Sequence, residues 1–479
     1  MIKVRIETLG CRLNQLESEA IATSFKNNNY EISMESVSAK TVGDEQTLIC
    51  VLNTCTVTQK SEQKARRIIR LQLKKFPKSV VIVTGCYAQV AKDEIEKIDP
   101  RICVVPGLVK SRILNLADVS NEYFKSHPDT ADFSSFDFIN FINEKLFNAP
   151  VLKNDFPEAA FKLYTDKFNA HSRASLKIQD GCNNNCSYCA IHKARGHSVS
   201  IDVETATQRV IELENQGQSE VVITTVNIGQ YKSEYNGEIY NFAKLLNHLL
   251  KNTSKINFRI SSLYPEIVDD EFCEVIKNDR VRPHFHISVQ SGSDKILKLM
   301  NRNYVANDVL VACQRLKIAK KSPFIACDII TGFPGETDED FEQTLKLCKD
   351  SGFTWIHAFP YSERPGTDAV KLPNKVPQSI SGERAKRLTE FAINSKIEYI
   401  NSFKGNILSA ILETEKKPLL ASSGNNSVIY HAMTENFIHC EILSSKKMEL
   451  NKTVQLRILD SLPGRIIKGG EIEAAAEFI

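Results

Sequence analysis

The sequence has no long apolar run. Its 479 residues contain no stretch of the roughly 18–20 consecutive apolar residues that a membrane-spanning helix requires. The opening segment, MIKVRIETLG, lacks the apolar core of a secretory signal. These absences exclude a helical membrane protein, and they predict a cytoplasmic chain with no membrane partner.

An excess of charge of one sign is also missing. The chain has 61 Lys and Arg against 58 Asp and Glu, a formal net charge of +3, which by itself does not indicate a nucleic-acid partner. The composition, 42% apolar and 25% charged, is typical of globular proteins. A chain of this length predicts two or three domains.

The cysteines do not form the pattern of a disulfide framework. There are 13, an odd number, and in a reducing cytoplasm they are expected to be metal ligands and core residues. No Ser/His/Asp set or carboxylate pair suggests a hydrolytic site.

Three cysteines stand in the segment GCNNNCSYCAIHKARG, and no fourth follows. Cys182, Cys186 and Cys189 have the spacing CxxxCxxC. A zinc site would need a fourth ligand, which His192 or His197 could supply. A [4Fe-4S] cluster held at three corners would leave one iron open to a non-protein ligand. Spacing and position favour iron–sulfur, with zinc as the alternative.

The order of predicted elements indicates an α/β fold. The N-terminal part alternates strands with helices, which predicts a parallel sheet. Six strand–helix units follow in the central part and predict a partial (βα)6 barrel. Short alternating strands after Gly405 predict a small β-domain. The predicted segments are an N-terminal domain (1–118), a linker or insertion without clear periodicity (119–170), the barrel (171–403) and the β-domain (404–479).

Three more cysteines lie just past the ends of N-terminal strands. Cys11 follows the first predicted strand, Cys55 the second and Cys86 the third. The carboxyl ends of parallel strands share one edge of a sheet, where ligands bind. We therefore expect these three cysteines to converge on a second open cluster. The other seven are assigned to packing: Cys50, Cys103, Cys273, Cys313, Cys327, Cys348 and Cys440.

Taken together, these motifs resemble the radical S-adenosylmethionine (SAM) methylthiotransferase family. The resemblance covers nearly the whole chain. It is carried by TLGCRLNQLESEA, LNTCTVT, VTGCYAQ, LKIQDGCNNNCSYCAI, ARG, SVQSGSD, DIITGFPGET and YSERPGT. The chain departs from the family pattern at His192, where Pro is usual, and at Ile201, where Arg is common.

The resemblance implies two [4Fe-4S] clusters and two SAM molecules. One cluster, on Cys182, Cys186 and Cys189, would bind SAM and cleave it reductively. The auxiliary cluster, on Cys11, Cys55 and Cys86, would supply sulfur, and the C-terminal domain would be a TRAM-like substrate-binding domain. An electron donor such as flavodoxin or ferredoxin is expected.

Three further residues are candidate SAM contacts. Tyr188 fits the aromatic position near the adenine, or it covers the cluster loop. Asn227 and Gln290 follow the second and fourth barrel strands and could bond SAM, or each could cap the next helix.

The predicted substrate is the anticodon loop of tRNA. TLGCRLNQLESEA and NTCTVT look most like the branch that acts on N6-threonylcarbamoyladenosine beside the anticodon. N6-isopentenyladenosine in tRNA and an aspartate of a ribosomal protein are the alternative substrates, and a non-catalytic, zinc-stabilised RNA-binding protein is an alternative of another class. A basic helix after Cys55 could hold RNA phosphates or form a solvated face. Its basic residues are Lys64, Arg66, Arg67, Arg70, Lys74 and Lys75.

Overall fold

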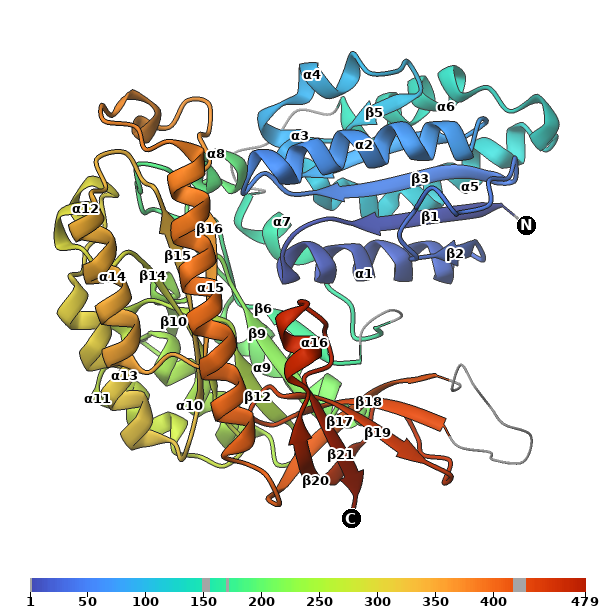
Figure 1. Cartoon of the computed structure of the whole chain (residues 1–479). Helices are drawn as coiled ribbons and strands as arrows, with labels where there is room; N and C mark the ends of the chain where they lie inside the picture. Colours follow the sequence, from blue (N-terminus) through green and yellow to red (C-terminus); the bar gives the residue numbers. More distant parts are fainter. Residues whose placement is uncertain (1, 149–155, 169–171, 417–427) are drawn as a thin grey trace. The chain divides into compact units, whose positions relative to one another are not determined.

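The computed structural model describes residues 2–148, 156–168, 172–416 and 428–479 (Figure 1). By its internal contacts the chain divides into two compact units. Unit 1 comprises Met1–Ala170, Ser175–Ile201 and Ser362–Val370, and unit 2 comprises His171–Ala174, Asp202–Tyr361 and Lys371–Ile479. The boundaries of the four predicted segments stay predictions. Parts of the predicted linker, 149–155 and 169–170, lie outside the described residues, as does Ser427 of a predicted strand.

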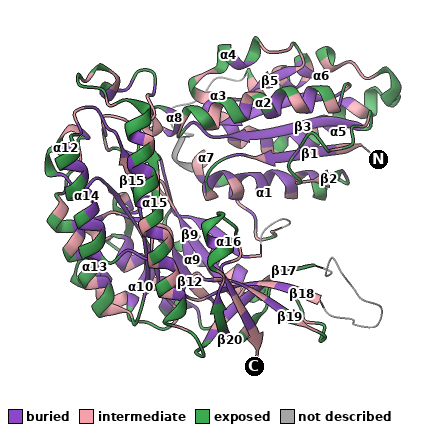
Figure 2. Ribbon diagram, viewed as in Figure 1, coloured by how far each residue is buried: buried purple, intermediate pink, exposed green. Residues whose placement is uncertain are grey.

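Unit 1 contains a parallel five-stranded sheet in the order β2-β1-β3-β4-β5. Every residue of β3 and β4 is buried, as Val- and Ile-rich strands covered on both faces should be (Figure 2). The strands are β1 (Lys3–Thr8), β2 (Glu31–Ser33), β3 (Thr47–Thr54), β4 (Val80–Gly85) and β5 (Ile102–Val104). The helices among them are α1 (Arg12–Asn27), α2 (Gln59–Lys75), α3 (Cys86–Val90) and α4 (Lys92–Glu96). The predicted parallel α/β arrangement is confirmed.

The segment for which the sequence showed no clear period is largely helical. Tyr123, Phe138 and Ile142 pack into the same core as Val4 and Phe25 of the sheet layer. Its described elements are most of α5 (Leu116–Ser126), η2 (Thr130–Asp132), α6 (Ser135–Ile142), η3 (Asn143–Phe147) and α7 (Phe156–Lys162), and η1 (Gly107–Asn115) precedes them.

The CxxxCxxC loop belongs to unit 1. It follows β6 (Ala174–Lys177) and β7 (Gln179–Asp180), and it leads into α8 (Ile191–Arg195) and β8 (Val199–Ser200), which pairs with β7. The unit also includes residues 362–370, which lie far away in the sequence.

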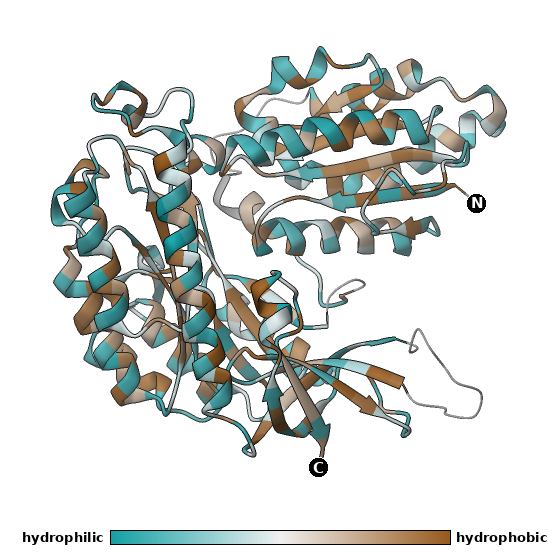
Figure 3. Ribbon diagram, viewed as in Figure 1, coloured by the Kyte–Doolittle hydropathy of each residue, from teal (hydrophilic) through white to brown (hydrophobic). Residues whose placement is uncertain are grey.

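Unit 2 contains parallel strands, with apolar residues concentrated on the strands (Figure 3). β9 (Glu220–Thr224) pairs with β12 (Asn257–Ile260), and a second sheet has the order β13-β14-β15-β16. The strands of that sheet are β13 (Ser262–Leu263), β14 (His284–Gln290), β15 (Phe324–Thr331) and β16 (Trp355–Pro360). The other elements are α9 (Val203–Asn215), η4 (Ile228–Gln230), the hairpin β10 (Ser233–Tyr235) and β11 (Glu238–Tyr240), α10 (Phe242–Asn252), η5 (Pro265–Ile267), α11 (Asp270–Ile276), α12 (Asp294–Leu299), α13 (Ala306–Ala319), α14 (Asp338–Ser351), η6 (Asp368–Lys371, in part of unit 1) and α15 (Gln378–Asn401).

The C-terminal strands close into a small barrel, as predicted for a small β-domain. The barrel order is β17-β18-β19-β21-β20, and the short helix α16 (Pro463–Ile467) lies between β20 and β21 in the sequence. The strands are β17 (Ile407–Lys416), β18 (Val428–Thr434), β19 (His439–Ser444), β20 (Thr453–Ser461) and β21 (Ala474–Phe478). β21 was not predicted, and it pairs in parallel with β19 and antiparallel with β20.

Candidate active site

The three dispersed cysteines lie at one edge of the unit 1 sheet. Cys11 precedes α1, Cys55 directly follows β3, and Cys86 begins α3 directly after β4. Burial, with smaller contributions from Cys86 and Cys11, raises the pKa of the Cys55 thiol to about 12. The strands that precede these cysteines are neighbours in the sheet, and convergence of the three thiols on one cluster stays a prediction. Cys11 is exposed, and the other two are buried.

A glycine precedes the first cysteine of each set, at a point where the backbone comes close to another segment. Gly10, with φ of +112°, precedes Cys11, and a Cβ there would lie 2.5 Å from the Cβ of Cys55. Gly181, with φ of +70°, stands in the same place before Cys182, and a Cβ there would lie 1.9 Å from the carbonyl oxygen of His197. Each glycine therefore lets a cysteine loop turn where a side chain would collide.

Backbone N–H groups of the CxxxCxxC loop point at two of its sulfurs. The Asn184 N–H donates to Cys182 Sγ over 3.4 Å, and the Ile191 N–H donates to Cys189 Sγ over 3.4 Å. A further N–H to carbonyl bond of 3.0 Å, from Cys189 to Cys186, tightens the loop. Such donors stabilise thiolate sulfur and tune the potential of iron–sulfur clusters, so the donor set fits a cluster held by three cysteines.

The two cysteine sets adjoin through short helices. α3, which begins at Cys86, is in contact with α8, which begins two residues after Cys189. Gly107 fits between the two loops, because a Cβ there would lie 3.3 Å from the Gly85 carbonyl and 3.4 Å from the Ala194 carbonyl. Unit 1 thus contains all six predicted cluster cysteines.

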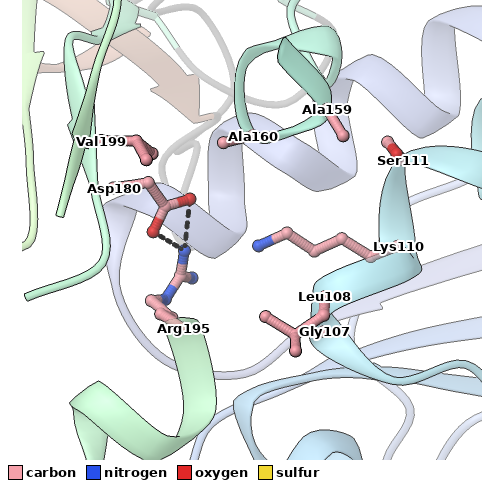
Figure 4. A pocket seen from close by; sticks show the side chains of 9 residues that line it. All are labelled: Gly107, Leu108, Lys110, Ser111, Ala159, Ala160, Asp180, Arg195 and Val199. Carbon is pink, nitrogen blue, oxygen red and sulfur yellow. Dashed lines mark hydrogen bonds and ion pairs between the residues drawn. The ribbon is translucent and has the colours of Figure 1, made fainter. Parts of the chain in front are cut away.

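A buried cluster of charges lies beside these helices. Arg195 donates to Asp180 over 2.9 and 3.1 Å, and Lys110 points toward the pair (Figure 4). The Glu17 carboxylate lies 2.5 Å from the Lys110 ammonium and 3.3 Å from the Arg195 guanidinium. The Lys177 ammonium lies 3.2 Å from Glu17 and 3.0 Å from Asp180. With three cations and two anions, the cluster carries one excess positive charge.

The charges of this cluster hold both acids ionised. Burial alone would raise the pKa of Glu17, but Lys110, Arg195 and Lys177 outweigh it and lower the pKa to about 2. Burial opposes ionisation of Asp180 too, and Arg195 with Lys177 keeps its pKa well below the usual range. Arg195 also interacts with the thiols of Cys86 and Cys11.

Residues 362–370 bridge the two cysteine loops. Arg364 is buried. It donates over 2.6 Å to Oγ1 of Thr56, which directly follows Cys55, and it also donates to Glu62 in the first turn of α2. The Ala369 N–H donates over 2.7 Å to the carbonyl of Ser187, inside the CxxxCxxC loop. This segment, which contains most of the motif YSERPGT, is thus a strap across both loops.

Comparison with known proteins identifies the family. Residues 176–348 match the Radical SAM superfamily, and residues 3–107 match the family described as Uncharacterized protein family UPF0004. Threonylcarbamoyladenosine tRNA methylthiotransferase MtaB of Treponema pallidum (strain Nichols) is 37% identical over 503 residues, which cover 98% of this chain and 100% of that protein. The protein of the same name from Bacillus subtilis (strain 168) is 34% identical, with 96% of this chain and 94% of that protein covered.

The chain belongs to the radical SAM methylthiotransferase family.

A more distant relative has a different stated product. The tRNA-2-methylthio-N(6)-dimethylallyladenosine synthase of Wolbachia pipientis subsp. Culex pipiens (strain wPip) is 28% identical and covers 86% of this chain and 88% of that protein. Membership of a radical SAM methylthiotransferase family makes the chain an enzyme that uses SAM and a [4Fe-4S] cluster. It also decides against a non-catalytic, zinc-stabilised protein.

In this methylthiotransferase, the cluster ligands themselves remain predictions. Across residues 2–148, 156–168, 172–416 and 428–479, no three His, Cys, Asp or Glu side chains are grouped tightly enough to hold a metal ion. In the same residues, no helix combines the length and apolar character needed to cross a bilayer.

The predicted SAM contacts fall in both units of the methylthiotransferase. Tyr188 is half-buried in the CxxxCxxC loop. Asn227, beyond the end of β9, is buried, and its side chain accepts the Gly229 N–H over 3.1 Å, so it caps η4. Gln290, the last residue of β14, is buried and has φ of +70°. Neither position tests the predicted contact with SAM.

The basic helix after Cys55 is α2, which is largely hydrophilic (Figure 3). Lys64, Arg67, Arg70 and Lys74 are exposed. Arg66 is held by Tyr87 and Glu94, at 2.7 and 2.9 Å, and Lys75 donates to the Ala39 carbonyl. Four of the six predicted basic side chains therefore face solvent.

Proposed function

We propose that the chain transfers a methylthio group to C2 of N6-threonylcarbamoyladenosine, next to the anticodon of tRNA. The names of the relatives that are 37% and 34% identical support this substrate, and so do the motifs around Cys11 and Cys55. A base in a single-stranded loop can leave its stack and enter a pocket. The proposed substrate places the reaction in the cytoplasm.

Two [4Fe-4S] clusters and two SAM molecules are part of the proposal. Cys182, Cys186 and Cys189 would hold one cluster, and Cys11, Cys55 and Cys86 the auxiliary one. Together the clusters would supply the electron that cleaves SAM and the sulfur that is methylated and transferred. A one-electron donor such as flavodoxin or ferredoxin would deliver the electron.

The residues of the chain would bind, orient and shield these groups. The N–H donors of Asn184 and Ile191 would stabilise cluster sulfur, and Arg195 would offset the negative charge of thiolates at Cys86 and Cys11. Tyr188, Asn227 and Gln290 would contact SAM. The exposed basic residues of α2 would bind phosphates of the anticodon stem.

One observation carries the proposal. The contact between α3 and α8 brings the loop of Cys86 beside the loop of Cys189. A reaction that needs both a radical generator and a sulfur donor requires two such sites close together.

The deciding experiment is mass spectrometry of tRNA nucleosides from cells with and without the gene. We expect the 2-methylthio derivative of N6-threonylcarbamoyladenosine to disappear on deletion, and its unthiolated precursor to accumulate. Wild-type and Cys313→Ala genes should restore it, and Cys55→Ala should not. Loss of only the isopentenyladenosine derivative, or an altered ribosomal-protein mass with unchanged tRNA, would contradict the proposal.

A further inference from the structure

Unit 2 contains a cavity at the amino ends of its parallel strands. Its volume is about 520 Å³, within the range of about 300–1,000 Å³ that is usual for small-molecule sites. One wall comes from the first residues of β14, β15 and β16, and the other from the C-terminal barrel and the segment around α16. Gln290 ends β14 six residues beyond His284, about 20 Å along the strand. Of the predicted SAM contacts, Gln290 thus lies at the opposite end of β14.

The walls of the cavity are rich in flat rings. His284 stacks on Phe437 with ring centroids 4.0 Å apart and an interplanar angle of 17°. Trp355 and His357 follow on β16, and the Trp355 Nε1–H lies 3.4 Å from His357 Nδ1. Phe324, His286 and His439 complete the aromatic lining. Such faces bind planar rings by stacking, whatever the identity of the ring.

The polar groups of the lining are mainly acceptors. The lining contains three carboxylates and one ammonium group. The carboxylates belong to Glu413, Glu471 and Glu473, and the ammonium belongs to Lys396. Lys396 is already engaged, because its Nζ lies 2.6 Å from Glu473 and 3.8 Å from the centre of the Trp355 ring. The Arg173 guanidinium lies 3.2 Å from the Glu413 carboxylate. Even with Arg173 included, two cations stand against three carboxylates, so the lining has no excess of positive charge.

Two of the lining histidines add no positive charge near neutral pH. Burial lowers the pKa of His357 to about 4, and burial also lowers the pKa of His439. A lining with three carboxylates and one engaged ammonium disfavours phosphate groups, and hence an RNA strand or a nucleotide. It suits an uncharged ring that carries N–H donors.

A metal ion does not fit this cavity in the described part of the chain. Four histidines line it, but no three metal-ligating side chains are suitably grouped there. His286 instead pairs with Asp328, with 3.2 Å between Nε2 and Oδ1, and lies near Ser262.

We propose that this cavity binds an uncharged purine nucleoside. The purine ring stacks on the His357 ring, which stands at 82° to the ring of Trp355. Its amino group donates to the carboxylates of Glu413 and Glu473, which also pair with Arg173 and Lys396. The proposal does not depend on the RNA substrate of the enzyme, since the lining disfavours phosphate.

The test uses the full-length, cluster-reconstituted protein, with adenosine as the probe and SAM present at saturation. The sequence contains one tryptophan, Trp355, so its emission reports on this cavity alone. We expect equilibrium dialysis to give one adenosine bound per chain, with quenching of Trp355 emission over the same concentrations. AMP should bind at least tenfold more weakly. His357→Ala should weaken adenosine binding about tenfold, because it removes a stacking face. Asp350→Asn, on the exposed side of α14, is the matched control and should bind like the wild type.

Several results would overturn the proposal. One is adenosine binding that does not saturate, and another is displacement of adenosine by SAM. A third is AMP or inorganic phosphate that binds as tightly as adenosine. A fourth is a folded His357→Ala protein that binds adenosine with unchanged affinity. If that variant does not fold, the comparison of adenosine with AMP on the wild type decides alone.

Discussion

At the residue scale, the six predicted cluster cysteines should fall into two functional classes. Replacement of Cys182, Cys186 or Cys189 by Ala removes one of three ligands from the proposed SAM-binding cluster. We expect reductive cleavage of SAM, measured as 5′-deoxyadenosine by liquid chromatography, to fall below detection. Cys55→Ala should retain most of that cleavage and lose thiolated product. A normal yield of thiolated product from Cys55→Ala would refute the auxiliary assignment.

Cys313 and Cys348 are the matched controls for this series. Both are buried cysteines outside the predicted ligand sets. Each Ala variant should lose about 1 kcal/mol of unfolding free energy, the cost of a small buried group. Iron content after reconstitution should equal that of the wild type, and a lower iron content would show that the ligand assignment is incomplete.

The charge of Arg195, as well as its size, should contribute to the stability of the fold. Arg195→Ala removes the guanidinium that donates to both oxygens of the buried Asp180 carboxylate and leaves Lys177 as its partner, which should cost about 3–5 kcal/mol. Urea denaturation monitored by circular dichroism measures this loss. Arg67→Ala, on the exposed face of α2, should change stability by no more than about 0.5 kcal/mol. Equal effects of the two variants would contradict the role given to the buried cluster.

At the element scale, a buried carboxylate connects β9 and β12. Glu220 on β9 accepts from Arg259 on β12 over 2.7 and 3.1 Å and from Arg282 over 3.1 Å. Burial alone would raise the pKa of Glu220, but Arg259, Arg173 and Arg282 lower it to about 2, against 4.5 for an ordinary Glu. A lowered pKa contributes stability that is fully present above pH 4.5 and is lost as the pH falls toward 2.

The pH dependence of Glu220→Gln follows from this sign. The variant should be less stable than the wild type at pH 7, and the gap in unfolding free energy should narrow between pH 5 and pH 3. Urea denaturation at a series of pH values measures the gap. A gap that stays constant down to pH 3 would be inconsistent with an ionised, ion-paired Glu220.

The helix α6 permits a comparison within one turn. Phe138 is fully buried in the unit 1 core, and Phe136 is 66% exposed. Phe138→Ala should cost about 3–5 kcal/mol through the lost burial and the cavity left behind. Phe136→Ala should stay within about 0.5 kcal/mol. Similar thermal denaturation midpoints for the two variants would show that α6 is not part of the core.

Most strands could be predicted because their residues are uniformly apolar or alternate with period 2. β21 was missed because its sequence, AAAEF, has the high helix propensity of alanine, and pairing with β19 and β20 overrides that propensity. α6 was missed because only Asp137 and Asn140 interrupt its apolar residues, and so few polar positions give no clear period.

The sequence predicted one part of the candidate site and missed another. Cysteines at strand ends could be placed by topology alone. The ion cluster of Glu17, Lys110 and Arg195 could not, because its partners are separated by 93 and 178 residues and no local pattern connects them.

At the scale of the whole molecule, metal content tests the number of clusters. Two [4Fe-4S] clusters correspond to about eight iron atoms per chain after anaerobic reconstitution, and loss of one auxiliary ligand should lower that toward four. Iron and zinc analysis of the wild type and Cys55→Ala, with visible absorption spectra, measures this. One or two zinc atoms without visible absorption would contradict the two-cluster proposal.

The strap at residues 362–370 also sets an order of events during synthesis. Arg364 reaches its partner Glu62 across 302 residues of chain. At about 5–20 residues per second, the ribosome makes Arg364 some 15–60 s after Glu62. Throughout that interval the nascent N-terminal sheet carries its cysteine loops without the segment that later fastens them together.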